Sequence, residues 1–253
     1  MSLYQSMIRH GHTMFRWRSY LPLVFIGPLL LAFKESAHVE ALVGGGIEDI
    51  WVLCCFILSL SGIAIRAVTV GFVPGSTSGR NTTEQRADFL NTRGMYSVVR
   101  NPLYLGNFII ILGLLLSIKV WWLVLIAAMF FFIYMERIIL TEEHFLEGKF
   151  GDTYNTWRAQ TPVIIPNLKL WQSPGVAFSW KTVLRREYPG LLGMATAFLV
   201  TEAVTDLVFE KENFSEWVHE DFIWPLVYTI IFVFCITLRY LKKHTQILKV
   251  EGR

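Results

Sequence analysis

Long apolar segments alternate with polar ones along the chain, and the apolar segments have lengths suited to crossing a membrane. A transmembrane helix needs about 20 mostly apolar residues. Six segments are candidates: 20–33, which can extend towards Val43, 50–72, 103–118, 120–140, 191–209 and 222–240. The pattern predicts an all-α, polytopic integral membrane protein with about six transmembrane helices.

The connections between these segments differ in length and polarity. Little more than Lys119 separates segments 103–118 and 120–140, which predicts a tight antiparallel hairpin. Long polar stretches, 73–93 and 141–189, flank that hairpin. The first 19 residues are polar and basic, and no small-residue cleavage site follows the first apolar segment. We therefore expect that segment to be a retained span and not a cleaved signal peptide.

Lysine and arginine residues predict the orientation of the spans, because they concentrate on the cytoplasmic side. With the N-terminus placed in the cytoplasm, 18 of them fall on that side and three, Lys34, Lys119 and Lys211, on the other. Arg66 and Arg137 lie within or at the ends of spans. The bias predicts that both termini and both long polar connections are cytoplasmic.

The composition excludes several other classes of protein. The chain of 253 residues is 53% hydrophobic and 17% charged, whereas soluble domains have about 25% charged residues. A net charge of +3 is too small for nucleic-acid binding by bulk charge. Cys54, Cys55 and Cys235 all lie in apolar segments without metal-ligand spacing, so neither a disulfide framework nor a metal site is predicted.

A first cluster of polar and aromatic residues begins at Gly94, where a polar connection enters a span. Tyr96, Arg100 and Tyr104 recur every four residues, so they share a face if this segment is helical. Pro102 is compatible with the first turn of a helix. Taken alone, the cluster is equally typical of a membrane-entry segment with interfacial aromatic residues and a snorkelling arginine.

A second cluster follows the hairpin and contains paired carboxylates, Glu142 and Glu143. Apolar residues at helical spacing predict an amphipathic helix that lies along the interface. Thr141 is placed to cap this helix, with the two carboxylates in its first turn. That structural interpretation does not explain why two such polar clusters flank one short hairpin.

The two clusters together form an ordered pattern of motifs. It reads Gly94-x-Tyr96-x-x-x-Arg100-x-Pro102-x-Tyr104-x-Gly106, the predicted hairpin, Glu142-Glu143 with Leu146 in Glu-x-x-Leu spacing, Phe150-Gly151-x-x-Tyr154-x-x-Trp157, and prolines at 162 and 166. Over about residues 90–168 this pattern resembles the isoprenylcysteine carboxyl methyltransferase superfamily, which includes phospholipid N-methyltransferases. The resemblance implies that S-adenosylmethionine binds in a cytoplasmic-side pocket formed by both motifs.

The resemblance also implies roles for individual residues. Residues that would contact the cofactor or shape its pocket are Tyr96, Arg100, Asn101, Pro102, Tyr104 and Gly106. Glu142 and Glu143 would hold the amino end or the ribose of the cofactor. The pocket would be closed by Tyr154, Trp157 and Arg158. The implied catalytic residues are Arg100, Asn101, Glu143 and Arg158. Asn101 stands where many members have His, and asparagine cannot take a proton. No metal is implied.

The connection before the first motif contains a glycine- and hydroxyl-rich stretch. Backbone N–H groups, hydroxyls and guanidinium groups can cradle a phosphate. Candidate phosphate ligands are Ser76, Thr77, Ser78, Arg80, Asn81 and Arg86. The stretch is similar to bacterial family members that methylate lipid A phosphate, which implies a membrane lipid acceptor and a bacterial inner membrane. The structural alternative is a solvated loop.

Alternatives for the function remain. An isoprenylcysteine carboxylate or a phospholipid amine could accept the methyl group, and His144 or Glu142 could act as base for an amine. A sterol-reductase-type enzyme shares an Arg-x-Pro-x-Tyr-x-Gly segment but binds NADPH. A small-molecule transporter would require an internal repeat, and none is visible.

We expect one membrane domain, 1–253, with methyltransferase motifs in 90–168 and two additional C-terminal spans in 190–242. Glu202 and Asp206 are one helical turn apart in the first of these spans. Acidic groups at membrane depth are candidates for function. Because Asp206 lies near the predicted outer end, away from the cofactor side, we favour a packing role.

Overall fold

The computed structural model describes residues 3–17, 20–43, 45–74, 87–210, 213–220 and 222–250, and every regular element in these ranges is a helix. In chain order they are α1 (Leu3–Trp17), the 3₁₀ helix η1 (Leu21–Phe25), α2 (Ile26–Val43), α3 (Gly45–Gly71), α4 (Met95–Val98), α5 (Pro102–Ser117), α6 (Trp121–Phe150), α7 (Asp152–Gln160), the 3₁₀ helix η2 (Leu168–Leu170), α8 (Trp180–Val204), the π-helix η3 (Thr205–Glu210), α9 (Phe214–Glu220) and α10 (Ile223–His244).

Four helical stretches among the described residues are long and apolar enough to cross a membrane. They are Ile47–Gly71, Trp121–Phe150, Trp180–Phe209 and Ile223–His244, and α5 is a shorter apolar helix beside them. This confirms the all-α polytopic membrane fold. The first predicted segment forms η1 and α2 and is not among the four, because the 18 residues of α2 include three charged ones, Lys34, Glu35 and Glu40.

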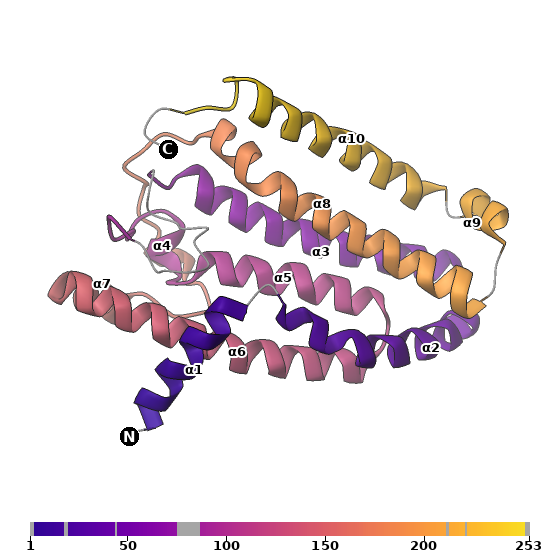
Figure 1. The fold of residues 1–253 in the computed structure, drawn as a ribbon, viewed down its shortest axis with the longest axis horizontal. Helices are drawn as coiled ribbons and strands as arrows, with labels where there is room; N and C mark the ends of the chain where they lie inside the picture. The colour runs from indigo at the N-terminus through magenta and orange to yellow at the C-terminus, as the bar shows by residue number, and fades with distance from the viewer. Residues whose placement is uncertain are drawn as a thin grey trace.

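The long helices lie side by side in a layered bundle (Figure 1). α3 packs along α5 on one side and α8 on the other, and α10 packs on α8. Glycines permit the close approach of α3 and α5, since a Cβ on Gly62 would meet the Gly106 carbonyl oxygen at 2.6 Å and one on Gly113 would meet the Cys55 carbonyl oxygen at 2.5 Å. Small residues commonly let membrane helices approach in this way.

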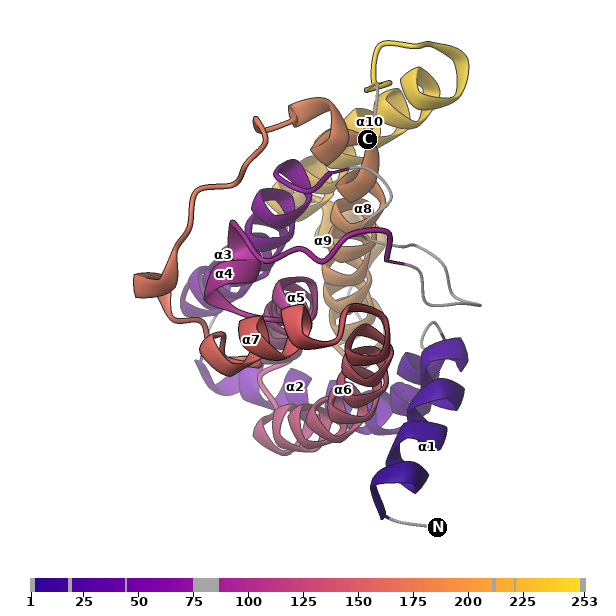
Figure 2. The ribbon, with the colours of Figure 1, turned by 90° about the vertical axis from the view of Figure 1, so that its left-hand side faces the viewer.

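The predicted hairpin around Lys119 is present. α5 ends at Ser117 and α6 begins at Trp121, and Lys119 turns the chain with a φ of 63°. The two helices then diverge, and α1 crosses α6 on its outer side (Figure 2). The space between α5 and α6 is therefore not closed by direct helix packing along its whole length.

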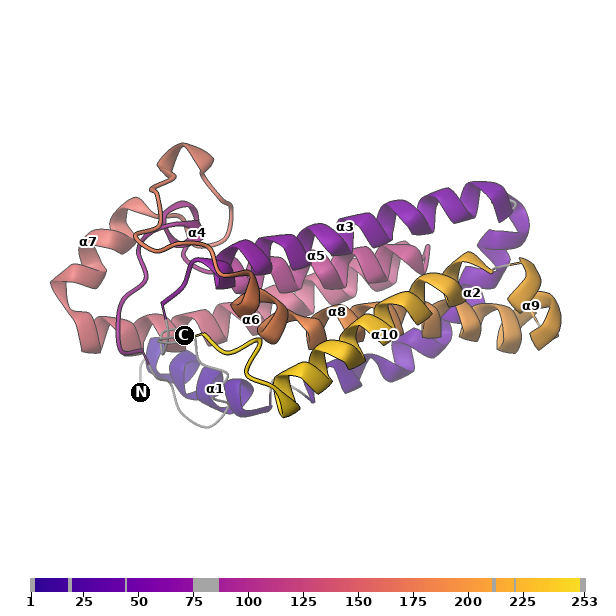
Figure 3. The same cartoon turned by 90° about the horizontal axis from the view of Figure 1, so that it is seen from above.

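The short helices α4 and α7 gather at one end of the bundle, together with α1 and the last described residues after α10 (Figure 3). α9 lies at the opposite end. Both polar clusters identified in the sequence belong to the α4–α7 end. This end is the one that the charge bias predicts to be cytoplasmic.

Candidate functional site

The two polar clusters are joined by hydrogen bonds at the α4–α7 end of the bundle. The backbone N–H of Arg100 donates to the carbonyl of Pro162 at 2.8 Å. The indole Nε1 of Trp157 donates to the carbonyl of Tyr96 at 3.0 Å. The segment after α7 therefore runs beside the segment before α5, and motifs about 60 residues apart in the sequence form one site.

The first cluster is not one continuous helix, contrary to the expectation that Tyr96, Arg100 and Tyr104 share a helical face. α4 ends at Val98, Val99 is extended, and α5 begins at Pro102. A proline disfavours helical conformation in the residue before it, and Asn101 has φ −124° and ψ 58°. The Asn101 amide does not cap α5 but donates to the carbonyl of Val163 at 3.1 Å.

The second cluster begins inside a helix, so the predicted N-cap at Thr141 is wrong. α6 continues for 30 residues from Trp121 to Phe150, and the Thr141 hydroxyl donates to the carbonyl of Arg137 within it. Because α6 remains helical, Glu142 and Glu143 extend from the last turns of a membrane helix. Gly151, with φ 52°, separates α6 from α7.

A cavity of about 810 Å³ opens between these segments and the long helices. Nine of the residues predicted to form the cofactor pocket line it: Tyr96, Arg100, Asn101, Pro102, Tyr104, Glu142, Glu143, Tyr154 and Trp157. Its deeper wall, from α5 and α6, is apolar and includes Ile110, Leu114, Phe130, Phe131, Met135 and Ile138. One cavity therefore combines a polar end with a large apolar surface.

We call Arg100, Glu143 and Tyr154 the motif centre. The Arg100 Nη1 lies 2.8 Å from Glu143 Oε1, and both side chains are largely buried. Tyr154 is fully buried, and burial raises its pKa to about 12. Tyr154 interacts with both Arg100 and Glu143, but neither its hydroxyl nor Arg100 Nε makes a hydrogen bond of good geometry among the described residues. Such buried polar atoms favour a ligand in the cavity.

Two further side chains of the cavity wall are linked to each other. The Tyr104 hydroxyl donates to Glu142 Oε1 at 2.7 Å. Tyr96 lies close to this carboxylate, and burial together with Glu142 raises the Tyr96 pKa to about 12. Tyr96 is therefore a neutral phenol at physiological pH and can donate or accept a hydrogen bond.

Two predicted residues lie outside the cavity lining. Arg158 is placed 3.3 Å from Glu147, and both side chains are more than a third exposed. Gly106 faces α3, where an added Cβ would meet Arg66 Cγ at 2.6 Å. Gly106 thus makes room for the Arg66 side chain and shapes the cavity through that residue.

The predicted phosphate cradle lies outside the described residues. This applies to Ser76, Thr77, Ser78, Arg80, Asn81 and Arg86. Their role remains a prediction from the sequence.

The sequence interpretation missed a second charged group in the cavity wall. Arg66 of α3 donates to both carboxylate oxygens of Glu187 of α8, at 2.7 and 3.2 Å. Its remaining nitrogen donates to Asn107 Oδ1 at 2.6 Å. Arg186, next to Glu187, also lines the cavity. We call Arg66, Asn107, Arg186 and Glu187 the α8 centre. A charged residue inside an apolar span, Arg66, indicated that a buried partner exists, but Glu187 lies in a polar segment where a carboxylate is not unusual.

Part of the chain is similar to a known protein family. Residues 74–153 match the phospholipid methyltransferase family. This stretch, about a third of the chain, is similar to a phospholipid methyltransferase domain. It includes α4, α5, α6 and the beginning of α7, and therefore the apolar wall of the cavity and most of the motif centre. The α8 centre draws Arg66, Arg186 and Glu187 from outside the stretch that matches the methyltransferase family.

Two curated relatives share parts of the chain. The nickel-cobalt-cadmium resistance protein NccN of Alcaligenes xylosoxydans xylosoxydans is 31% identical over 128 residues, which is 50% of this chain and 57% of the relative. The protein-S-isoprenylcysteine O-methyltransferase of Schizosaccharomyces pombe is 35% identical over 77 residues, which is 30% of this chain and 33% of the relative. The chain thus covers about half and a third of their lengths. No solved structure gives a significant match.

Proposed function

We propose that the protein is an S-adenosylmethionine-dependent methyltransferase that methylates an anionic oxygen of a membrane lipid, with a lipid phosphate as the first candidate. The observation that carries this proposal is the cavity itself. It joins the motifs of the stretch that matches the methyltransferase family to a long apolar wall inside a membrane bundle. A polar end beside an apolar wall suits a soluble cofactor and an acceptor with acyl chains.

The polar groups of the cavity suit S-adenosylmethionine. Its sulfonium and ammonium groups are attracted by carboxylates and aromatic faces, which Glu142, Tyr96 and Trp157 supply. Its carboxylate suits a guanidinium, and the buried Arg100 Nε makes no hydrogen bond of good geometry among the described residues. The motif centre would hold the cofactor's amino acid end.

The chemistry requires orientation more than proton transfer. The bound cofactor supplies a sulfonium methyl group, so an anionic acceptor oxygen forms the new O–CH₃ bond as the sulfur–methyl bond breaks and its electron pair stays on sulfur. The ion pair with Glu143 fixes the Arg100 guanidinium, whose positive charge would lie beside the reacting groups. Asn101 cannot act as a base, and an acceptor that is already ionised at neutral pH needs none.

The proposal also includes the phosphate ligands and the membrane orientation that the sequence predicts. Ser76, Thr77, Ser78, Arg80, Asn81 and Arg86 would bind the acceptor phosphate from the loop that precedes α4. The α4–α7 end would face the cytoplasm of a bacterial inner membrane, where the cofactor is available. The lysine and arginine bias of the sequence supports this orientation.

The test is methyl incorporation from labelled S-adenosylmethionine into membrane extract by the purified protein. Arg100→Ala should abolish incorporation, whereas Arg185→Ala, at a residue outside the cavity lining, should not. Calorimetric titration of the cofactor accompanies both variants and separates loss of binding from loss of transfer.

The label identifies the acceptor class. Label in a phosphate-bearing lipid supports the proposal in full. Label in an amine lipid or a prenylated protein supports the methyltransferase and overturns the acceptor. If no label is incorporated and the cofactor does not bind, the methyltransferase proposal fails, and NADPH binding would test the reductase alternative.

A further inference from the structure

The cavity wall opposite the stretch that matches the methyltransferase family is supplied by α8. Three residues of this helix, Arg186, Glu187 and Gly190, line the cavity although they lie outside residues 74–153. The sequence pattern had assigned the C-terminal spans no role. The cavity is therefore incomplete without a helix that lies outside the stretch that matches the methyltransferase family.

Glu187 fixes α8 to the bundle through Arg66. Both of its carboxylate oxygens accept from the Arg66 guanidinium, whose third nitrogen is bound to Asn107 of α5. The Glu187 side chain is only 6% exposed. Such a bidentate contact between buried groups has a defined geometry, so it sets the position of the neighbouring residues of α8. Gly106 provides the space that the Arg66 stem occupies.

Arg186 is the residue that this arrangement presents to the cavity. Glu187 is engaged through both oxygens by Arg66, so the Arg66–Glu187 pair is close to neutral. Among the described residues, Glu142, which accepts from Tyr104, and Arg186 also line the cavity. The charges of Glu142 and Arg186 act in opposite directions on the same phenol, Tyr96. Both side chains take part in further interactions, and they place one negative and one positive charge on the cavity wall.

We propose that Arg186, positioned by the Arg66–Glu187 pair, contributes a guanidinium to the binding of the anionic group of the lipid acceptor, in addition to the loop residues proposed above. This inference rests on the proposed function and assigns part of the acceptor's recognition to a residue outside the stretch that matches the methyltransferase family. A guanidinium binds phosphate and carboxylate oxygens in a bidentate manner, which an ammonium cannot do equally well. Glu142 would face the positive groups of the cofactor, and the apolar wall of α5 and α6 would receive the acyl chains.

The test measures lipid retention and does not depend on methylation. The purified protein is equilibrated with equal amounts of phosphatidic acid and diacylglycerol of the same acyl chains, and the bound lipids are counted by native mass spectrometry. Wild-type protein should favour phosphatidic acid. Arg186→Gln should lower that preference by at least about tenfold, the loss expected for a hydrogen bond to a charged group.

Arg185 offers a matched control in the same helix. It is adjacent to Arg186 but does not line the cavity, so Arg185→Gln should leave the preference unchanged. Arg186→Lys, which keeps the charge, should retain part of it. Thermal midpoints of all three variants show whether the fold is intact.

Two results would overturn the inference: an equal loss in Arg185→Gln and Arg186→Gln, or a wild-type protein that retains the two lipids equally. The proposed function is judged by a different measurement, the labelled methyl transfer. An Arg186-dependent preference without methyl transfer would leave the binding site standing and remove the enzyme.

Discussion

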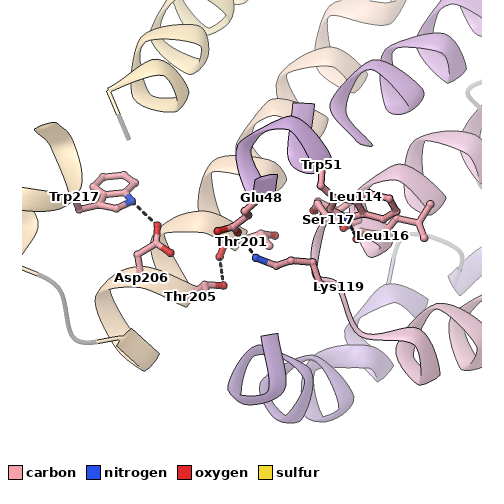
Figure 4. Close-up of polar contacts among 10 residues, drawn as sticks. All are labelled: Glu48, Trp51, Leu114, Leu116, Ser117, Lys119, Thr201, Thr205, Asp206 and Trp217. Carbon is pink, nitrogen blue, oxygen red and sulfur yellow. Dashed lines mark hydrogen bonds and ion pairs between the residues drawn. The ribbon is translucent and has the colours of Figure 1, made fainter. Parts of the chain in front are cut away.

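Buried ion pairs lie at both ends of the bundle, and they have different surroundings. At the α4–α7 end, Arg66 of α3 pairs with Glu187 of α8 in the cavity wall. At the other end, Glu48 of the same helix pairs with Lys119 in the α5–α6 turn, outside that wall (Figure 4). Along α3 the two positions are about 27 Å apart, at ~1.5 Å per residue.

At the end of the bundle that carries α9, neighbouring helices are joined by side-chain contacts (Figure 4). The indole of Trp51 donates to the Leu116 carbonyl at 2.9 Å, and the indole of Trp217 donates to Asp206 at 2.7 Å. These residues join α3 to the hairpin and α9 to η3. The contact of Asp206 agrees with the packing role that we favoured from its position in the sequence. A charged residue at membrane depth is thus a functional candidate mainly when it also faces a cavity.

The largest expected effect is on the rate of methyl transfer, and it should appear on mutation of the motif centre but not of the nearby surface. Glu143→Gln removes the charge that pairs with the buried Arg100, and we expect methyl transfer to fall about 100-fold, as on loss of one preorganised electrostatic contact. Glu147→Gln is the control, because Glu147 forms an exposed pair with Arg158 and exposed pairs contribute little. Equal rates in the two variants would contradict the assignment of the motif centre.

The α8 centre should show a large effect on stability. Glu187→Ala leaves the Arg66 charge buried without its carboxylate, which we expect to cost about 3–5 kcal/mol in the free energy of unfolding. Replacing both residues, with Arg66→Met and Glu187→Met, should restore most of that stability because no buried charge remains. Unfolding in mixed micelles measures this. Recovery of stability without recovery of the lipid preference would confirm that the pair positions Arg186.

The Glu48–Lys119 pair should affect stability alone. Lys119→Met leaves Glu48 without its ammonium, so the free energy of unfolding should fall, by at most about 3–5 kcal/mol. Methyl transfer per folded molecule should stay at the wild-type value, because neither residue lines the cavity. A specific loss of transfer in this variant, with normal cofactor binding, would show that the two ends are coupled.

The sequence allowed the prediction of features that depend on local patterns. Apolar length predicted six spans, of which four form helices long enough to cross a membrane and one forms the shorter α5; Lys119 predicted the hairpin and Pro102 the beginning of α5, and both are present. Most of the residues predicted for the cofactor pocket lie together because they belong to two motifs on either side of one hairpin. Their chemical roles remain part of the proposal.

Features that depend on contacts between distant segments could not be predicted. Nothing in the local sequence indicates that Glu187 meets Arg66, 121 positions away. The continuous α6 was missed because the polar residues from Thr141 onward are equally typical of a new helix N-terminus. The helix simply extends beyond its apolar part. Arg158 pairs with Glu147 and also lies 5.7 Å from the centroid of the Tyr154 ring, so it is beside the motif centre but outside the cavity lining, and its role remains a prediction.

The smallest expected effect is on the pH dependence of methyl transfer, which can come from an ionisable group of the protein or of the acceptor. Burial raises the pKa of Tyr96 to about 12 in the folded protein, from an ordinary value of 10.0. Its contribution to stability is therefore fully present below pH 10 and is lost as the pH rises through about 12. Between pH 5 and 9 this phenol stays neutral, so it cannot give the rate a pH dependence.

A lipid phosphate does titrate in this range, with a second pKa of about 6. If the acceptor is a phosphate, methyl transfer should rise as the pH increases through about 6, and Tyr96→Phe should leave the midpoint of that rise unchanged even where it lowers the rate. Initial rates at saturating cofactor between pH 5 and 9 provide the measurement. A midpoint that shifts in Tyr96→Phe would mean that a group of the protein, and not the acceptor, controls the ionisation on which transfer depends.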